Sequence, residues 1–410
     1  MNAVTFSPSQ TTANRLGASK RRIGPVVRLA LLAGCTAIFA ANFARAQSSD
    51  PGTAQPRSIH SKLYKTTYHP WDLSALPSYQ PEEETQGVIR FHGSQTATNL
   101  LTLFEERFRK AYRQHHHNIR FRNNFLSSPV TFSGLCAGTA DVGQVGHKAW
   151  PMDIRAFREY FGYDPLEIII ASGTYDIGGS TPSPAFFVNK NNPISRLTLA
   201  QLDGIFGSQR TGGWRGGVDW DKSLARGPEK NIRTWGQLGL TGEWADKPIR
   251  LYGLDLTLSQ WSLLVQEFVF QGGDKWNSAL KEIPRGGAVN DAASADDTIV
   301  AEVAKDPYGI GFIIMRAVQK NPGVKALALA RGPEGPYVLP TKETFQNQTY
   351  PLLNYLYVYL NRPPGKPLAP RLKEFLKFIL SREGQECVAE DAQYLPLTAE
   401  LAREQLAKLE

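Results

Sequence analysis

Hydroxyl side chains stand in a short loop that leads into a predicted helix. The loop reads Gly93-Ser94-Gln95-Thr96, follows a strand-like run at 87–92, and precedes apolar residues at helical spacing from 99 to about 114. Helix N-termini carry unpaired N–H groups and partial positive charge, and hydroxyls add donors without adding net charge. The loop could therefore bind a small oxyanion. Ser94 or Thr96 would also suit a purely structural role as a helix cap.

The marked sequence motifs of enzymes and metal sites are missing from the chain. It has no Gly-x-Ser-x-Gly, no His-Glu-x-x-His and no phosphate-cradling loop with a lysine. The run His115-His116-His117 looks like a metal tract, but consecutive residues at a helix end point in different directions. We expect a binding protein that is not an enzyme and that holds no metal and no cofactor.

Strand-like runs alternate with helical patterns along most of the chain after residue 87. This alternation predicts an α/β fold with a largely parallel sheet. A Gly- and Trp-rich stretch at 209–230 is expected to be a surface excursion. Further strands are expected at 119–125, 167–171, 185–189 and 248–252, and helices at 132–140, 197–206 and 259–270.

The formal net charge of +8 belongs mostly to the N-terminal segment. Residues 1–46 hold six of the 46 basic side chains and none of the 38 acidic ones, so the remaining chain carries a net charge of only +2. That remainder has no basic stripe interleaved with aromatic residues, so nucleic-acid binding is not expected.

The same N-terminal segment has the three parts of a signal peptide. A basic region precedes a mostly apolar run at 29–43, and Ala44-Arg45-Ala46 offers small residues for cleavage before Gln47. We therefore expect an exported, periplasmic protein. Leu32-Ala33-Gly34-Cys35 matches a lipoprotein signal, an alternative that the short apolar run before it disfavours.

The expected mature chain begins with a leader and contains two cysteines. Residues 47–86 are rich in Ser, Pro, Gln and Glu, which predicts a flexible or loosely packed segment. Cys136 and Cys387 could form a disulfide in an oxidising compartment. The sequence does not show whether they lie close enough, so paired and free thiols are both open.

Several motifs in a fixed order resemble the phosphate-binding proteins of ABC transporters. The clearest runs from Tyr350 to Asn361 and continues at 375–385; earlier ones are Asn192 to Gly207, Trp235-Gly-Gln-Leu-Gly239 and Asp306 to Phe312. The resemblance implies a two-lobed type 2 periplasmic binding fold, with two hinge strands and a ligand in the cleft between the lobes. It further implies a monomer whose partners are a small-molecule ligand and an ABC permease.

The resemblance also predicts how the chain divides. Hinge strands are expected near 185–189 and 353–360. One lobe then consists of 87–184 together with 351–410, so that a helix at 371–380 packs on it. The other lobe consists of 185–350.

Family members hold phosphate with three segments, and each of them corresponds to a stretch of this chain. The first corresponds to the loop at 93–96, which makes Ser94, Gln95 and Thr96 expected ligand residues. In the second, Ser128 keeps the family's serine, but the glycines beside it are gone. Because Pro129 lacks an N–H, this segment offers fewer backbone donors.

The third segment has changed most. It corresponds to 253–260, where Thr257 and Ser259 are the remaining hydroxyl residues. Leu254 stands where the family has an arginine, and Gly146 where it often has an aspartate that accepts a proton from phosphate. Without the arginine, the site has no bidentate clamp for an oxyanion.

The ligand is therefore expected to be phosphate or another small anion, and its identity stays open. An alternative is a secreted ligand-binding or structural protein with a diverged pocket that serves no transporter. Tyr175 and Asp176, in the loop before the first hinge strand, are further candidate ligand groups, although an ordinary surface turn explains them equally well.

Overall fold

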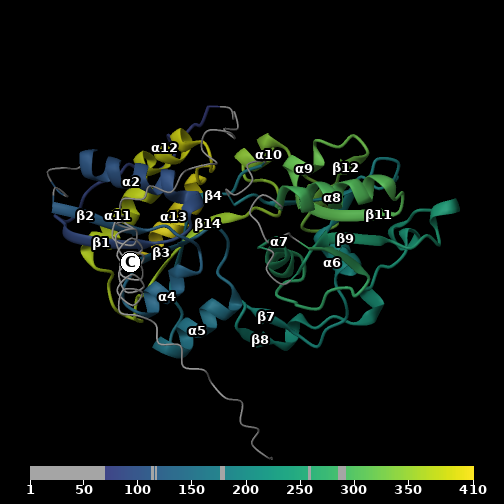
Figure 1. Ribbon diagram of the computed structural model, residues 1–410, viewed down its shortest axis with the longest axis horizontal. Coiled ribbons are helices and arrows are strands. Elements are labelled where there is room, and N and C mark those ends of the chain that lie inside the picture. The colour runs from purple at the N-terminus through teal and green to yellow at the C-terminus, as the bar shows by residue number, and fades with distance from the viewer. Residues whose placement is uncertain (1–69, 112–114, 116–117, 176–180, 257–259, 285–291) are drawn as a thin grey trace, which may run out of the picture. The chain divides into compact units, whose positions relative to one another are not determined.

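The computed structural model describes residues 70–111, 115, 118–175, 181–256, 260–284 and 292–410. The expected signal peptide lies outside these residues. Within them, no helix is both long enough and apolar enough to cross a lipid bilayer. They contain two five-stranded sheets with helices packed on them, which confirms an α/β fold (Figure 1).

The first sheet joins four strands from the N-terminal part of the chain to one strand from near its end. Its order is β2-β1-β3-β14-β4. β1 pairs in parallel with β2 and β3, whereas β14 is antiparallel to β3 and β4. The strands are β1 (Gln86–His92), β2 (Asn118–Asn124), β3 (Val142–Val145), β4 (Leu166–Ser172) and β14 (Tyr355–Leu360).

Strand β14 is packed on both faces, and its sequence alternates accordingly. Leu356, Val358 and Leu360 belong to one apolar cluster, whereas Tyr357 and Tyr359 belong to another. Successive side chains of a strand point to opposite faces, so the alternation separates aliphatic groups from rings. We name each cluster by the side chains that β14 contributes to it. The aliphatic cluster, which also holds phenylalanines, includes residues of α2 (Thr98–Ala111), α11 (Pro370–Leu380), α12 (Arg382–Asp391) and α13 (Ala399–Ala407). The tyrosine cluster includes residues of α4 (Val130–Cys136) and α5 (Pro151–Phe161).

The second sheet has the order β10-β9-β11-β5-β12. β9 pairs in parallel with β10 and β11, and β5 is antiparallel to β11 and β12. β5 and β11 are buried along their whole length. The strands are β5 (Pro184–Asn189), β9 (Arg250–Leu254), β10 (Leu280–Ile283), β11 (Gly309–Ile314) and β12 (Val324–Ala326), and the main helices are α6 (Leu199–Phe206), α7 (Gln260–Leu264), α8 (Ala292–Lys305) and α9 (Met315–Val318).

Each sheet is therefore mixed, rather than largely parallel as expected. The antiparallel strands are β5 and β14, which overlap the two expected hinge strands. Helix α11, at the position of the expected helix at 371–380, packs on β1, α2, α12 and α13. The lobe boundaries drawn from the sequence stay a prediction.

Two segments differ from their expected form. The helix expected at 259–270 begins as α7 and continues as a π-helical segment, η6 (Val265–Val269). The excursion at 209–230 contains a hairpin of β7 (Gly213–Arg215) and β8 (Asp219–Asp221). The remaining elements are β6 (Arg196–Thr198), β13 (Ala328–Ala330), α10 (Lys342–Gln346) and the 3-10 turns η1 (Gln95–Ala97), η2 (Lys222–Leu224), η3 (Pro228–Lys230), η4 (Trp235–Leu238) and η5 (Gly242–Trp244).

Part of the expected flexible leader is packed. Leu76 and Tyr79 are buried in the aliphatic cluster of the first sheet. The Tyr79 hydroxyl bonds to the Glu374 carboxylate, and its ring lies edge-on to Phe378 at 5.7 Å. The expectation of flexibility is therefore wrong for these residues, because their apolar side chains find a surface on α11.

We expect Tyr359→Phe to destabilise the protein. The buried Tyr359 hydroxyl accepts a hydrogen bond from the Ala149 N–H at 2.9 Å and donates one to Glu167 Oε2 at 2.8 Å. Its removal leaves both groups without this partner, at a cost of about 1–3 kcal/mol in the free energy of unfolding. Urea unfolding measures the change, with Tyr160→Phe at an exposed ring as the control. Equal stability of Tyr359→Phe and the unmodified protein would contradict the expectation.

Candidate functional site

The loop at 93–96 lies at the carboxyl edge of the first sheet, beside the end of β3. β1 and β3 are parallel, with His92 opposite Gly143, so both strands end at this edge. Ser94 Oγ accepts a hydrogen bond from the Thr96 N–H at 3.3 Å, and the Ser94 and Thr96 hydroxyls are 2.9 Å apart. Ser94 thus caps η1, as the structural interpretation predicted. Both side chains are nevertheless half-exposed, so capping leaves them accessible.

Gln144, near the end of β3, contacts this loop through its buried side chain. Its Oε1 accepts a hydrogen bond from the Ser94 N–H at 2.9 Å. Gln144 is fully buried, and its Nε2 has no hydrogen-bond partner within the described chain. An idealised Cβ on Gly93 would lie 2.8 Å from Oε1 and 2.9 Å from the Gln144 Cβ. Glycine is therefore required at 93 for the loop to approach Gln144 so closely.

Thr181 brings a third hydroxyl to the same place. A Cβ built on Gly146 would lie 3.2 Å from Thr181 Oγ1 and 3.9 Å from Thr96 Oγ1, so the two hydroxyls flank this glycine. Thr181 Oγ1 is buried and, among the described residues, has no hydrogen-bond partner. The Thr181 backbone has φ of +56°, a conformation that is uncommon for a β-branched residue. Such outliers cluster at functional sites.

The remaining expected ligand residues are less closely tied to this place. Gln95 is exposed in η1, and Ser128 is half-exposed just before α4. The first turn of α4 reaches β3, because Thr131 Oγ1 donates to the Gln144 carbonyl oxygen at 2.8 Å. Thr257 and Ser259 lie outside the described residues.

The two positions at which this chain lacks the family's charged residues supply no charge to the site. Gly146 has no side chain, and Leu254 is fully buried in the core of the second sheet. Tyr175 is also in that core, edge-on to Phe345, rather than at the site; Asp176 lies outside the described residues. The hydroxyl site, by which we mean Ser94, Thr96, Gln144, Gly146 and Thr181, is therefore made of neutral residues.

His147 and Lys148, the ionisable residues that follow Gly146, supply no free charge to the hydroxyl site. Burial lowers the pKa of His147, which is therefore neutral at pH 7; its Nδ1 lies 2.6 Å from the Lys148 carbonyl oxygen. Lys148 forms an ion pair with Glu267 of η6. Burial opposes the charge on Lys148, but the carboxylates of Glu267 and Glu167 outweigh it and raise its pKa.

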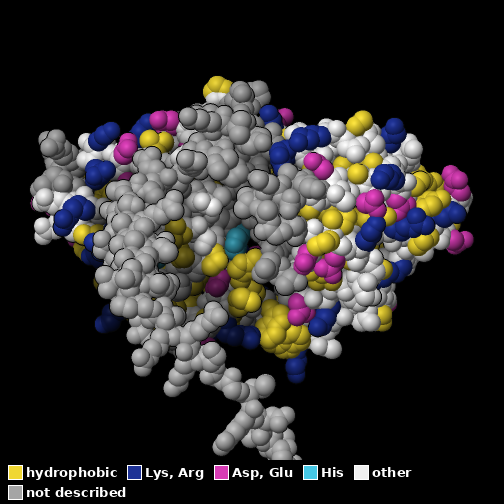
Figure 2. All heavy atoms as spheres, in the orientation of Figure 1, with side chains coloured by type: hydrophobic (Ala, Val, Ile, Leu, Met, Phe, Trp, Pro, Cys, Tyr) yellow, Lys and Arg dark blue, Asp and Glu magenta, His cyan; other side chains and the backbone are white. Residues whose placement is uncertain are grey.

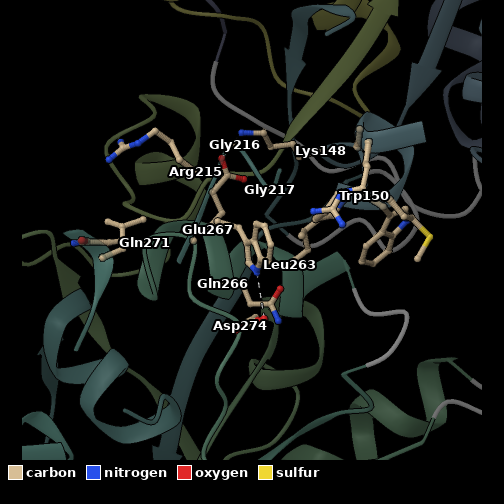
Figure 3. A pocket seen from close by; sticks show the side chains of 17 residues that line it. Lys148, Trp150, Arg215, Gly216, Gly217, Leu263, Gln266, Glu267, Gln271 and Asp274 are labelled. Atoms are coloured by element: carbon tan, nitrogen blue, oxygen red, sulfur yellow. Dashed lines mark hydrogen bonds and ion pairs between the residues drawn. The ribbon is translucent and has the colours of Figure 1, made fainter. Parts of the chain in front are cut away.

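Beyond Lys148 lies a cavity of about 710 Å³ (Figure 3). Its walls come from the start of α5, the β7–β8 hairpin, and the α7–η6 segment, and none of the expected ligand residues lines it. In Figure 2, apolar side chains gather where Figure 1 shows the β7–β8 hairpin. The hairpin is tied to α5 by an ion pair of 2.7 Å between Arg158 and Asp219.

The cysteines and the described acidic and histidine residues offer no further site. Cys136 and Cys387 are both free thiols in separate parts of the first sheet's packing, so the open question of a disulfide is answered against pairing. Across the described ranges, no group of three or more His, Cys, Asp or Glu side chains could hold a metal ion. His116 and His117 lie outside those ranges.

Sequence reasoning missed Gln144, Thr181 and the cavity. Gln144 is an ordinary residue in a strand, and only the close approach of Gly93 makes it part of the site. Thr181 ends the loop at 172–181, which was expected to be able to face the cleft, but only Tyr175 and Asp176 were named there as candidate ligand groups. The Trp-rich composition of 209–230 was a visible signal for the cavity wall, but composition alone does not show what the stretch faces.

Comparisons with known proteins identify the family of this chain. A family model for the PBP superfamily domain matches residues 80–383. The phosphate-binding protein PstS of Pseudomonas aeruginosa strain PAO1 is 31% identical over 335 residues, covering 82% of this chain and 91% of that protein. Protein SphX of Synechococcus elongatus is 24% identical over 331 residues, covering 80% and 82%. The crystal structure of a possible phosphate binding protein from Planctomyces limnophilus has a TM-score of 0.41 at 20% identity, covering 79% of this chain and 98% of that one.

We expect Gly93→Ala to destabilise the protein by about 1–3 kcal/mol, because the added methyl group overlaps the Gln144 side chain. A double-mutant cycle with Gln144→Ala should recover part of this loss, since two of the three closest atoms belong to that side chain. Thermal unfolding measures the effect. Gly332→Ala is the matched control, with no atom within 4 Å of its new methyl group. An unchanged stability of Gly93→Ala would show that the loop has room to spare.

Proposed function

Because the chain belongs to the PBP superfamily, we propose that it is the substrate-binding component of a phosphate-type ABC transporter and binds phosphate or another small oxyanion. The observation that carries the choice of ligand is the convergence of three hydroxyls and one amide at the carboxyl edge of the first sheet. Ligands of open α/β sheets bind outside the carboxyl ends of the strands, which is where these groups lie.

The hydroxyl site offers donors that the protein itself leaves unused. Thr181 Oγ1 and Gln144 Nε2 are buried and lack partners within the described chain, which is costly for polar groups. A bound oxyanion would accept hydrogen bonds from both, as well as from whichever of the half-exposed Ser94 and Thr96 hydroxyls does not donate to the other. Uncharged donors of this kind stabilise an anion without requiring a buried positive charge.

The proposal also covers export, delivery to a transporter and the place in the fold where the ligand is held. The signal-like segment at 1–46 supports a periplasmic location, and the resemblance to the phosphate-binding proteins of ABC transporters supports delivery to an ABC permease. We place the ligand between lobes composed of 87–184 with 351–410 and of 185–350. Function as a transporter-independent secreted binding protein is the alternative, and the changed positions Gly146 and Leu254 favour it.

We expect phosphate to bind more weakly than a site with the family's aspartate and arginine would allow. A hydrogen bond to a charged group contributes about 1.5–3 kcal/mol, so each missing partner should weaken binding by roughly one to two decades. Isothermal titration at neutral pH measures the affinity. Ser94→Ala and Thr181→Val should each weaken it by about tenfold, whereas Ser133→Ala, an exposed serine on α4, should leave it unchanged. If neither Ser94→Ala nor Thr181→Val changes the affinity for the oxyanion, the hydroxyl site is not where it binds.

We expect Gly146→Asp to increase the preference for phosphate over sulfate by roughly one to two decades. Phosphate keeps at least one proton at neutral pH and can donate it to the new carboxylate, whereas sulfate has none and is repelled. Competition titration of the two anions measures the ratio. Gly332→Asp, which adds the same charge in open space, is the control. A ratio that falls or does not change in Gly146→Asp would show that the anion does not lie beside this residue.

A further inference from the structure

The cavity beyond Lys148 has the size and lining of a binding site for an organic molecule. Its volume of about 710 Å³ is in the range of small-molecule pockets and far larger than a tetrahedral oxyanion needs. Apolar side chains make up much of its wall. We call it the tryptophan cavity, and the lining residues that matter here are Trp150, Met152, Arg155, Trp214, Leu263 and Gln266.

The two indole rings are held in place by neighbours rather than by each other. Trp214 lies edge-on to Trp220 at 5.1 Å, and its Nε1 donates to Asp274 at 3.4 Å. The Trp150 ring lies 5.2 Å from the His147 ring. Rings fixed in this way lose little conformational freedom when a planar or apolar ligand packs against them.

Among the cations that line the cavity, one has no carboxylate partner in the part of the chain that the structure describes. Lys148 is paired with Glu267, and Arg215 is paired with Asp221. Arg155 lies 5.3 Å over the Trp214 ring and has no carboxylate partner within the described chain. Its guanidinium is therefore positioned at an apolar wall with donors free for an anionic group.

We propose that the tryptophan cavity binds a small organic anion, with an aromatic or other apolar body against Trp150, Trp214 and Leu263 and its anionic group at Arg155. This site shares no residue with the hydroxyl site, and the inference does not rest on the proposed function. It gives the protein a second ligand class, distinguished by an apolar body that inorganic oxyanions lack.

The walls of the cavity come from two distant parts of the chain. Residues 148–155 follow β3 of the first sheet, whereas 214–274 lie between β5 and β11 of the second. A close approach of Gly217 to Pro151 and the ion pair of Arg158 with Asp219 hold these parts together. A ligand in the cavity contacts both parts and therefore stabilises this arrangement.

Isothermal titration with three probes tests the proposal. Naphthalene-2-sulfonate has both the apolar body and the anionic group, 2-naphthol has only the body, and methanesulfonate has only the anion. We expect binding of naphthalene-2-sulfonate, at least tenfold weaker binding of 2-naphthol, and no measurable binding of methanesulfonate in the cavity. No binding of naphthalene-2-sulfonate, or equal affinity for 2-naphthol, would overturn the proposal.

Variants then locate the bound probe. Leu263→Trp fills the cavity and Arg155→Gln removes its free cation, so each should weaken naphthalene-2-sulfonate at least tenfold. Leu339→Trp and Arg120→Gln, at exposed positions, are the matched controls and should have no effect. Met152→Trp, on the exposed rim, replaces Leu263→Trp if the latter does not fold. Probe binding that survives all three cavity variants would place it elsewhere.

The same variants separate this proposal from the proposed function. Leu263→Trp and Arg155→Gln should leave the affinity for inorganic phosphate unchanged, because neither residue belongs to the hydroxyl site. Loss of phosphate binding in both would contradict two separate sites. A protein that binds naphthalene-2-sulfonate but no inorganic oxyanion would keep the tryptophan cavity and refute the hydroxyl site.

Discussion

The hydrogen bond from the Ala149 N–H to the Tyr359 hydroxyl fixes the segment on which both candidate sites depend. Tyr359 occupies the ring-bearing face of β14, whose alternation commits it to the cluster with α4 and α5. Three residues before Ala149, Gly146 lies between the hydroxyls of Thr96 and Thr181; one residue after it, Trp150 lines the cavity. A chain spans at most about 3.3–3.6 Å per residue, so anchoring Ala149 restricts both positions.

Charge is distributed unequally along this segment. The hydroxyl site contains only neutral side chains, and the pKa of the neighbouring His147 is lowered by burial, so that it adds no charge at pH 7. Lys148 is committed to Glu267, and its raised pKa reflects that commitment. It therefore does not replace the arginine that the family places where Leu254 is buried. An anion bound at the hydroxyl site would rely on dipoles, whereas one in the cavity would meet the guanidinium of Arg155, which has no carboxylate partner among the described residues.

Local pattern predicted the elements well, and tertiary approach explains what it missed. The apolar periodicity at 99–114 specifies one packing, so α2 was found from local pattern, whereas β14 was expected from the resemblance as a hinge strand near 353–360. The resemblance identified the family, and the structure placed Ser94 and Thr96 together at a sheet edge. Gln144 and Thr181 could not be predicted, because their roles depend on how closely the Gly93 loop approaches and on a positive φ. Tyr79 was misjudged because the polar composition around it hid the surface on α11 that buries it.

The two sites are joined by the chain between them, which gives a reason to expect coupling. An oxyanion at the hydroxyl site would favour one path of residues 146–148, and an organic anion in the cavity would favour one position of 150–155. The ion pairs Lys148–Glu267 and Arg158–Asp219 already hold 146–148 and 150–155 in one arrangement, and this arrangement would suit both ligands. If both ligands bind and select the same arrangement, they would assist each other, and their coupling would be positive in sign and reciprocal in size. The changed positions Gly146 and Leu254 would then lower the affinity for the oxyanion but leave the segment at 146–155 in place. Through this segment, a ligand in the cavity would restore part of that affinity.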